Sequence, residues 1–256
     1  MNKKISIALG LALILGLGAG TYFYMSKSES TISDGQNVSD VQTNYKVAIT
    51  SSYTSPLKQS TILDLEGDLL AHLQGDEQIV SEWSSFSKFI AMDAPGIPTT
   101  ILNAETVSAV DEDAEWKHFV DSDFPSQYTG FQKEVLSRIF VPVPIRPVAE
   151  LYRNEREGKN LFKVLYTIRE NKEGFELIRS WIQTVQGQVR IDPKENGFRY
   201  QYDKDAKLVS MQGTLSYLGV DHENQDFRLT TKIFVNAKDT RSLASEKRKF
   251  RDRQTL

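Results

Sequence analysis

The chain has 256 residues, a formal net charge of −3 and no cysteine. The lack of cysteine excludes disulfides, thiolate metal sites, a cysteine nucleophile and a lipidated-cysteine anchor. The weak negative charge offers no overall attraction for nucleic acid, so we expect no nucleic-acid partner.

The amino terminus predicts export across a membrane. Lys3 and Lys4 precede an uncharged run of 21 residues from Ile5 to Met25. As a helix this run would span about 31 Å, close to the hydrocarbon core of a bilayer. We therefore interpret residues 1–25 as a signal anchor in the inner (cytoplasmic) membrane, a single-pass helix that leaves the rest of the chain in the periplasm. The alternative is a signal peptide cleaved near Gly18–Gly20, which would give a secreted protein.

Residues 26–44 are polar and rich in Ser, Thr, Asp and Asn, which predicts a flexible linker. Residues 45–240 then form the predicted extracytoplasmic β-rich domain. Its opening runs alternate apolar and polar side chains over 45–53 and 60–73, which indicates two strands with a bulge or bend at Gly67. The end of the second run also fits helical spacing.

The runs Tyr45-x-Val-x-Ile-x-Ser-x-Tyr53 and Leu63-x-Leu-x-Gly67 are similar in rhythm to the first sheet of vitellogenin-type lipid carriers. The resemblance covers only this stretch and carries no specific motif, so it assigns no residue a role. It implies that an apolar ligand of this chain would be a lipid.

Residues 78–89 predict a further strand or two, and an acidic segment follows. Asp111, Asp113 and Glu115 alternate close to His118. Such a group is able to bind a hard divalent cation or to act as general acid and base, which gives one hypothesis, a metal-dependent hydrolase. The spacing lacks the Gly and the Glu of an EF-hand loop. We favour a solvated acidic loop, with no catalytic residue, no metal site and no cofactor.

Apolar residues spaced three and four apart predict an amphipathic helix over residues 127–140, with Ser126 as its amino-terminal cap. Residues 141–147 contain three prolines, which exclude a helix or a central strand. We expect an extended connector there.

The best-patterned part of the chain runs from Leu161 to Asp239 and predicts an antiparallel meander. Its strands alternate apolar and polar side chains. Its turns carry Asn, Asp, Gly and Pro, which favour tight turns. The predicted turns lie at residues 171–174, 192–197, 203–205 and 221–224.

Large aromatic side chains lie along the apolar face of this meander. Core packing explains such a pattern, but aromatic residues with a polar end also line ligand sites. The predicted helix, about 20 Å long, is too short to cover the whole face. Either the sheet curls on itself, or part of the face is left for a ligand. The candidate ligand-binding residues are Phe162, Tyr166, Trp181, Tyr200, Tyr202 and Tyr217.

These patterns predict a mainly β fold: a large curved antiparallel sheet or an open barrel or sandwich with one amphipathic helix, preceded by the transmembrane helix. The hypothesis they favour is a non-enzymatic, membrane-anchored envelope protein that binds or transfers a lipid or other apolar ligand on a sheet face. The alternative is a scaffold or assembly subunit of an envelope complex, with envelope proteins as partners. Residues 241–256 form a basic tail, which we expect to be a solvated terminus or to contact lipid headgroups or an acidic partner.

Overall fold

The computed structural model describes residues 19–20, 41–73, 78–92, 96–110, 116–120, 124–141, 149–157 and 159–242. Several predictions from the sequence lie outside these residues: most of the anchor, of the linker and of the connector, the acidic residues 111–115, and the tail beyond Ser242. Within the described part, no helix has the length and apolar character needed to span a bilayer.

All the named strands belong to one antiparallel sheet. Apart from the two-residue strand β1, the strands fall into a group from the first half of the chain and a group from the second half. They are β2 (Val41–Thr54), β3 (Gln59–Leu73), β4 (Gln78–Ala91), β5 (Thr106–Val110), β6 (Trp116–Val120), β7 (Glu150–Glu157), β8 (Asn160–Asn171), β9 (Gly174–Gln186), β10 (Arg190–Asp203), β11 (Leu208–Val220) and β12 (Asp226–Ser242). A 3-10 turn, η1 (Thr99–Ile101), and one helix, α2 (Ser126–Ile139), complete the described elements.

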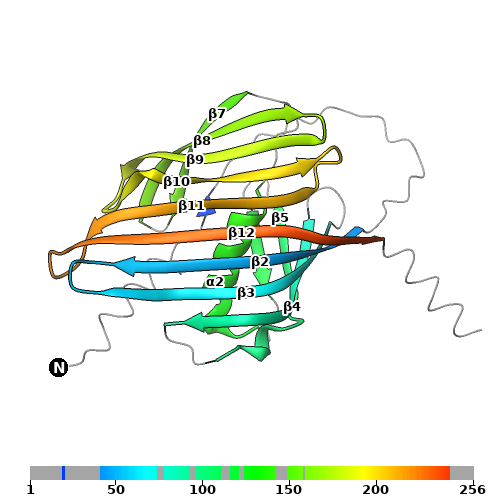
Figure 1. The fold of residues 1–256 in the computed structure, drawn as a ribbon, viewed down its shortest axis with the longest axis horizontal. Coiled ribbons are helices and arrows are strands. Elements are labelled where there is room, and N and C mark those ends of the chain that lie inside the picture. Colours follow the sequence, from blue (N-terminus) through cyan, green and yellow to red (C-terminus); the bar gives the residue numbers. More distant parts are fainter. Residues whose placement is uncertain are drawn as a thin grey trace, which may run out of the picture.

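The strand order is β1-β7-β8-β9-β10-β11-β12-β2-β3-β4-β5-β6. The predicted meander is confirmed as the run from β8 to β12, and the first long strand, β2, pairs with the last, β12, near the middle of the sheet (Figure 1). At one end, β1 (Ala19–Gly20), which falls within the predicted anchor, pairs with β7. Among the described strands, the two ends of the order do not pair, so the sheet is open.

The sheet curves around α2, which crosses behind β12, β2 and β3 at a steep angle (Figure 1). In a flat sheet, β4 and β7 would lie about 38 Å apart, because neighbouring strands are spaced by about 4.8 Å. A helix of 14 residues is only about 21 Å long. Yet Phe131 packs against Phe89 on β4, with 6.0 Å between ring centroids, while Arg138 lies 2.8 Å from Glu157 on β7. Both ends of the order therefore turn toward the helix.

We call the sheet face that contacts α2 the inner face. The buried core gathers there, with apolar side chains from β2 to β4, from β8 to β12 and from α2 in one cluster. The mainly β fold, with a single large curved sheet and one amphipathic helix, is confirmed. Because the sheet curves, one short helix contacts strands that would lie far apart in a flat sheet.

Two local predictions are wrong. The helix begins at Ser126, and its cap is Pro125, whose carbonyl accepts a hydrogen bond from the Tyr128 N–H at 2.9 Å. The predicted turn at residues 192–197 lies inside β10, where the pairing with β11 shifts between Ile191 and Asn196. Proline lacks the N–H that a regular ladder needs, so Asp192-Pro193 marks a bulge and not a chain reversal.

The other turns and the bulge are confirmed. Asp221 Oδ1 accepts hydrogen bonds from the backbone N–H groups of Glu223 and Gln225, at 2.8 and 3.0 Å. At Gly67 the pairing of β3 with β4 shifts, and a Cβ at this position would lie 2.6 Å from the carbonyl oxygen of Ser85. Only glycine permits that close approach of the two strands.

Candidate functional site

The structure brings all six predicted ligand-binding residues together on the inner face. Phe162 and Tyr166 come from β8, Trp181 from β9, Tyr200 and Tyr202 from β10, and Tyr217 from β11. All six are buried, none more than 6% exposed. Two pairs of these rings stack: Phe162 on Tyr217 at 5.4 Å between centroids, and Tyr200 on Tyr202 at 6.4 Å. All six side chains belong to the buried apolar cluster that also includes side chains of α2.

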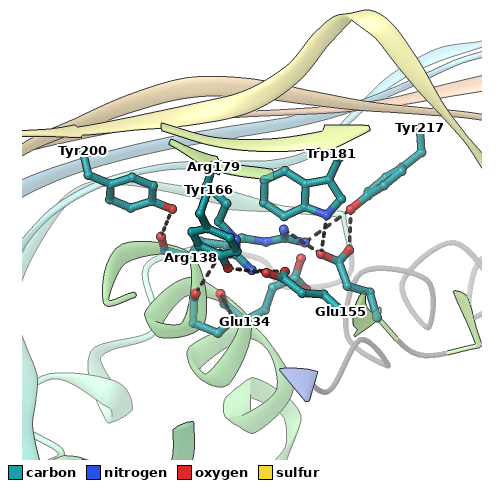
Figure 2. Close-up of polar contacts among 10 residues, drawn as sticks. Glu134, Arg138, Glu155, Tyr166, Arg179, Trp181, Tyr200 and Tyr217 are labelled. Atoms are coloured by element: carbon teal, nitrogen blue, oxygen red, sulfur yellow. Dashed lines mark hydrogen bonds and ion pairs between the residues drawn. The ribbon is translucent and has the colours of Figure 1, made fainter. Parts of the chain in front are cut away.

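Four of these aromatic residues also use their polar ends. The Tyr200 hydroxyl donates to the Arg138 carbonyl of α2 at 2.7 Å. The Trp181 indole Nε1–H donates to Glu157 Oε1 at 3.1 Å, and the Tyr217 hydroxyl donates to the other carboxylate oxygen of Glu157. The Tyr166 hydroxyl donates to Glu155. Figure 2 shows these side chains reaching from the sheet toward the helix.

Two buried ion pairs lie between α2 and the sheet, and we call Arg138, Glu155, Glu157 and Arg179 the ion-pair cluster. Arg138 Nη1 on α2 lies 2.8 Å from Glu157 Oε1, and Arg179 Nη2 on β9 lies 2.5 Å from Glu155 Oε2. Both guanidinium groups also lie against the Trp181 ring, 5.0 Å (Arg138) and 4.5 Å (Arg179) from its centroid. The cluster places four charges in the interior, each with an opposite charge next to it.

The neighbouring opposite charges favour the charged forms of Glu157 and Arg179. Burial alone would raise the pKa of Glu157, but the charge of Arg138 and hydrogen bonds from Arg138 and Tyr217 bring this pKa below its ordinary value. Burial would lower the pKa of Arg179, but the neighbouring Glu155 carboxylate raises it well above its ordinary value. These groups hold one another and offer no free acid or base to a substrate.

Glu134 lies beside the cluster and behaves differently. It comes from the same helix, and its Oε2 atom is buried with no hydrogen-bond partner among the described residues. Burial raises the pKa of Glu134 to about 8, although the charge of Arg138 lowers it. Glu134 is therefore mainly protonated at neutral pH, and the charges of the ion-pair cluster stay balanced.

The opposite side of the inner face holds α2 by aromatic packing and one polar chain. Trp83 Nε1–H on β4 donates to Gln132 Oε1 at 2.7 Å, and Gln132 Nε2 donates to Thr106 Oγ1 on β5 at 3.1 Å. Phe89 packs edge-on against both Tyr128 and Phe131. A helix with Gln132 and Arg138 among its buried residues is held partly by polar contacts, unlike a helix buried by apolar packing alone.

The two cavities next to the ion-pair cluster are small. Two cavities border the cluster, one beside Phe162 and Tyr217 and one beside Glu134 and Phe198, and each has a volume of about 10 Å³. Such a volume is at the lower limit for a single water molecule. Neither of these two cavities has room for an acyl chain.

The sequence did not identify the ion-pair cluster, although a signal was present. Arg179 falls between Leu177 and Trp181 on the apolar face of β9, where all three are buried. A charged residue at an apolar position of the alternation indicates a buried partner. Glu155 and Glu157 share one face of β7, but that strand is too polar to show which face is inside.

The structure does not describe the geometry of the predicted acidic site. Asp111, Asp113 and Glu115 lie outside the described residues, and His118 lies on β6, opposite Ser108 of β5. Among the residues that the structure describes, no three His, Asp or Glu side chains converge as metal ligands would.

Comparison with protein-family models and with curated proteins finds no match. Among solved structures, the fold is similar to a structure of lipovitellin described under lipid–protein interactions, with a TM-score of 0.60 and 8% sequence identity. That likeness covers 80% of this chain and 26% of the lipovitellin chain, so this chain spans about a quarter of its length. A putative outer membrane lipoprotein-sorting protein domain from Vibrio parahaemolyticus aligns over 78% of this chain and 86% of its own, at a TM-score of 0.27 and 10% identity. The lipovitellin likeness shows a shared fold.

Proposed function

We propose that this chain is a non-enzymatic protein that binds a lipid or other apolar ligand on the inner face of its curved sheet. The observation that carries the proposal is a continuous aromatic and aliphatic inner face, built from strands of both halves of the chain and covered across its middle by a single helix. Ligand sites are concave and mainly apolar, with a few well-placed polar groups. The inner face has this composition.

Binding requires α2 to leave its present position, because the cavity that Glu134 and Arg138 of α2 line has a volume of only about 10 Å³. The acyl chains would take the place of the apolar side of the helix, against rings of the inner face such as Phe89, which packs on Tyr128 and Phe131. These rings of the inner face would then exchange one apolar surface for another, which costs far less than exposing them to water. As the helix moves, Gln132 and Arg138 would lose their polar contacts with the sheet and be hydrated by solvent.

The fold shared with lipovitellin supports the proposal, because that structure is described by its lipid–protein interactions. A fold alone does not assign a function. The proposal therefore rests on the composition of the inner face, and the likeness adds an example of this sheet architecture in a protein that contacts lipid.

The direct test is to purify the full chain in a mild detergent, extract it with organic solvent and identify bound lipids, with native mass spectrometry to count them per chain. We expect co-purifying lipid, and uptake of added phospholipid by chains that lack it. A chain that carries no lipid and takes up none when phospholipid is titrated would overturn the proposal.

We also propose that the chain acts at a membrane of the cell envelope. The support is the uncharged run from Ile5 to Met25 after Lys3 and Lys4. A full-length chain that stays with membranes during alkaline extraction, and is digested by external protease in spheroplasts, has the expected anchor and orientation. A chain released at alkaline pH that starts near Thr21 has lost a signal peptide instead.

A further inference from the structure

The Arg138 guanidinium lies in a site that the sheet builds without the helix. Its Nη1 atom is 2.8 Å from Glu157 Oε1, its Nη2 atom is 3.5 Å from the Tyr217 hydroxyl, and its Cζ atom is 5.0 Å from the centroid of the Trp181 ring. The three partners come from β7, β9 and β11. We call Glu157, Trp181 and Tyr217 the Glu157 site.

The sheet also orients this carboxylate by itself. Trp181 donates to one oxygen of Glu157 at 3.1 Å, and Tyr217 donates to the other. Neither donor belongs to α2. The Glu157 site therefore keeps a carboxylate, an aromatic face and a hydroxyl in fixed positions when the helix is elsewhere, which is the chemistry that recognises an organic cation.

The second ion pair of the cluster shows why the site is open to a ligand. Glu155 pairs with Arg179, and the charge of Arg153, which lies on the same strand, also interacts with the Glu155 carboxylate. All three residues belong to the sheet, so this pair survives the departure of α2. By contrast, Glu157 forms its ion pair with Arg138, which leaves with the helix, and the charge of Arg179 on β9 has a smaller influence on the pKa of Glu157.

We propose that the Glu157 site binds the ammonium group in the headgroup of the lipid whose acyl chains replace α2, and that the ligand is therefore an ammonium-bearing lipid such as phosphatidylethanolamine. This inference rests on the function proposed above. An ammonium group restores the charge pairing of Glu157 and lies against the face of Trp181 as the guanidinium does. A headgroup without an ammonium group leaves the carboxylate unpaired in an apolar site, and a headgroup whose only charge is negative also repels it.

The test compares lipids that differ only in the headgroup. Full chain in detergent is titrated with dioleoyl phosphatidylethanolamine, dioleoyl phosphatidylglycerol and dioleoylglycerol, and binding is followed by native mass spectrometry. We expect the ethanolamine lipid to bind at least about tenfold more tightly than the other two. The variant Glu157→Gln keeps the shape of the side chain and removes its charge. In this variant the affinity for phosphatidylethanolamine should fall to that for phosphatidylglycerol, while the affinity for dioleoylglycerol is retained.

Two further variants make the result specific. Tyr217→Phe removes a single hydroxyl and should weaken the preference for ethanolamine over glycerol by a few-fold, which keeps the test available if Glu157→Gln does not fold. Glu176→Gln on β9 is the matched control, because Glu176 pairs at 3.4 Å with the well-exposed Arg199. It should leave all three affinities unchanged.

The outcomes separate the two proposals. If none of the three lipids binds, the proposed function itself fails. If all three lipids bind equally, or phosphatidylglycerol binds most tightly, the headgroup assignment is overturned and lipid binding stands. If ethanolamine or choline alone binds as tightly as the lipid, the site serves a free amine, and the lipid headgroup assignment is again overturned.

Discussion

Glu134 should make the stability of this protein fall as the pH rises, and the variant Glu134→Gln should remove that dependence. Burial raises the pKa of Glu134 from 4.5 to about 8 in the folded chain. Between these values the folded state holds a proton that the unfolded chain has released, so stability decreases with rising pH. The contribution is complete below the unfolded pKa and is lost as the pH rises through about 8.

The magnitude follows from the size of the shift. A rise from 4.5 to about 8 sets a ceiling of about 5 kcal/mol at about 1.4 kcal/mol per unit. Relaxation around a buried carboxylate lowers such values, and the buried glutamine amide needs hydrogen bonds that Glu134 does not make. We therefore expect Glu134→Gln to raise the free energy of unfolding by about 2–3 kcal/mol at pH 8.5, and by less than about 1 kcal/mol at pH 4.5.

Urea unfolding of the full chain at both pH values measures this difference. The control is Glu173→Gln in the exposed turn between β8 and β9, which should leave the free energy of unfolding unchanged at either pH. If Glu134→Gln is no more stable than the parent at pH 8.5, or gains equally at both pH values, the buried proton on Glu134 is refuted.

Three further predictions concern the contacts of α2 and the sheet bulge. Gln132→Leu should lower the free energy of unfolding by about 2–3 kcal/mol, because the buried Trp83 indole N–H loses its acceptor; an unchanged urea midpoint would speak against that bond. Gly67→Ala should destabilise by about 1–3 kcal/mol, because its Cβ would lie 2.6 Å from a backbone oxygen of β4, and a neutral result in thermal unfolding would mean that the two strands separate freely there. Arg138→Met should lower the free energy of unfolding by about 3–5 kcal/mol, because it leaves Glu157 unpaired, and adding Glu157→Gln should restore much of this loss. If the losses of the two single variants add up in the double variant, a direct ion pair is ruled out.

The strands of this sheet were predictable because one of their faces is apolar and the other is polar. The alternation around Tyr166 in β8 and around Ile233 in β12 indicates both the strand and its buried face. The turn at Asp221 was predictable because an Asp side chain bonds the backbone two residues further on. These signals are local, so the sequence shows them directly.

The ion-pair cluster and the curvature depend on partners far apart in the chain. β7 carries charged residues on both faces, so its pattern does not reveal that Glu155 and Glu157 are buried. Their burial is possible only because Arg179 and Arg138 reach the same place from β9 and α2. The turn predicted at Asp192-Pro193 fails for a related reason, since pairing with β11 holds that segment in a bulged strand. No local signal contains these pairings.

Tethering the helix shows whether lipid binds the inner face in place of α2. The chain contains no cysteine, so Phe89→Cys with Tyr128→Cys can be joined by a short reducible bismaleimide where the two rings now lie 6.1 Å apart. A control pair, Thr50→Cys with Lys232→Cys, joins two exposed partners on β2 and β12 away from the helix. We expect the tethered chain to bind no phospholipid, reduction to restore binding, and the control pair to bind phospholipid both when joined and when reduced. A tethered chain that binds phospholipid as tightly as the reduced one would contradict this expectation.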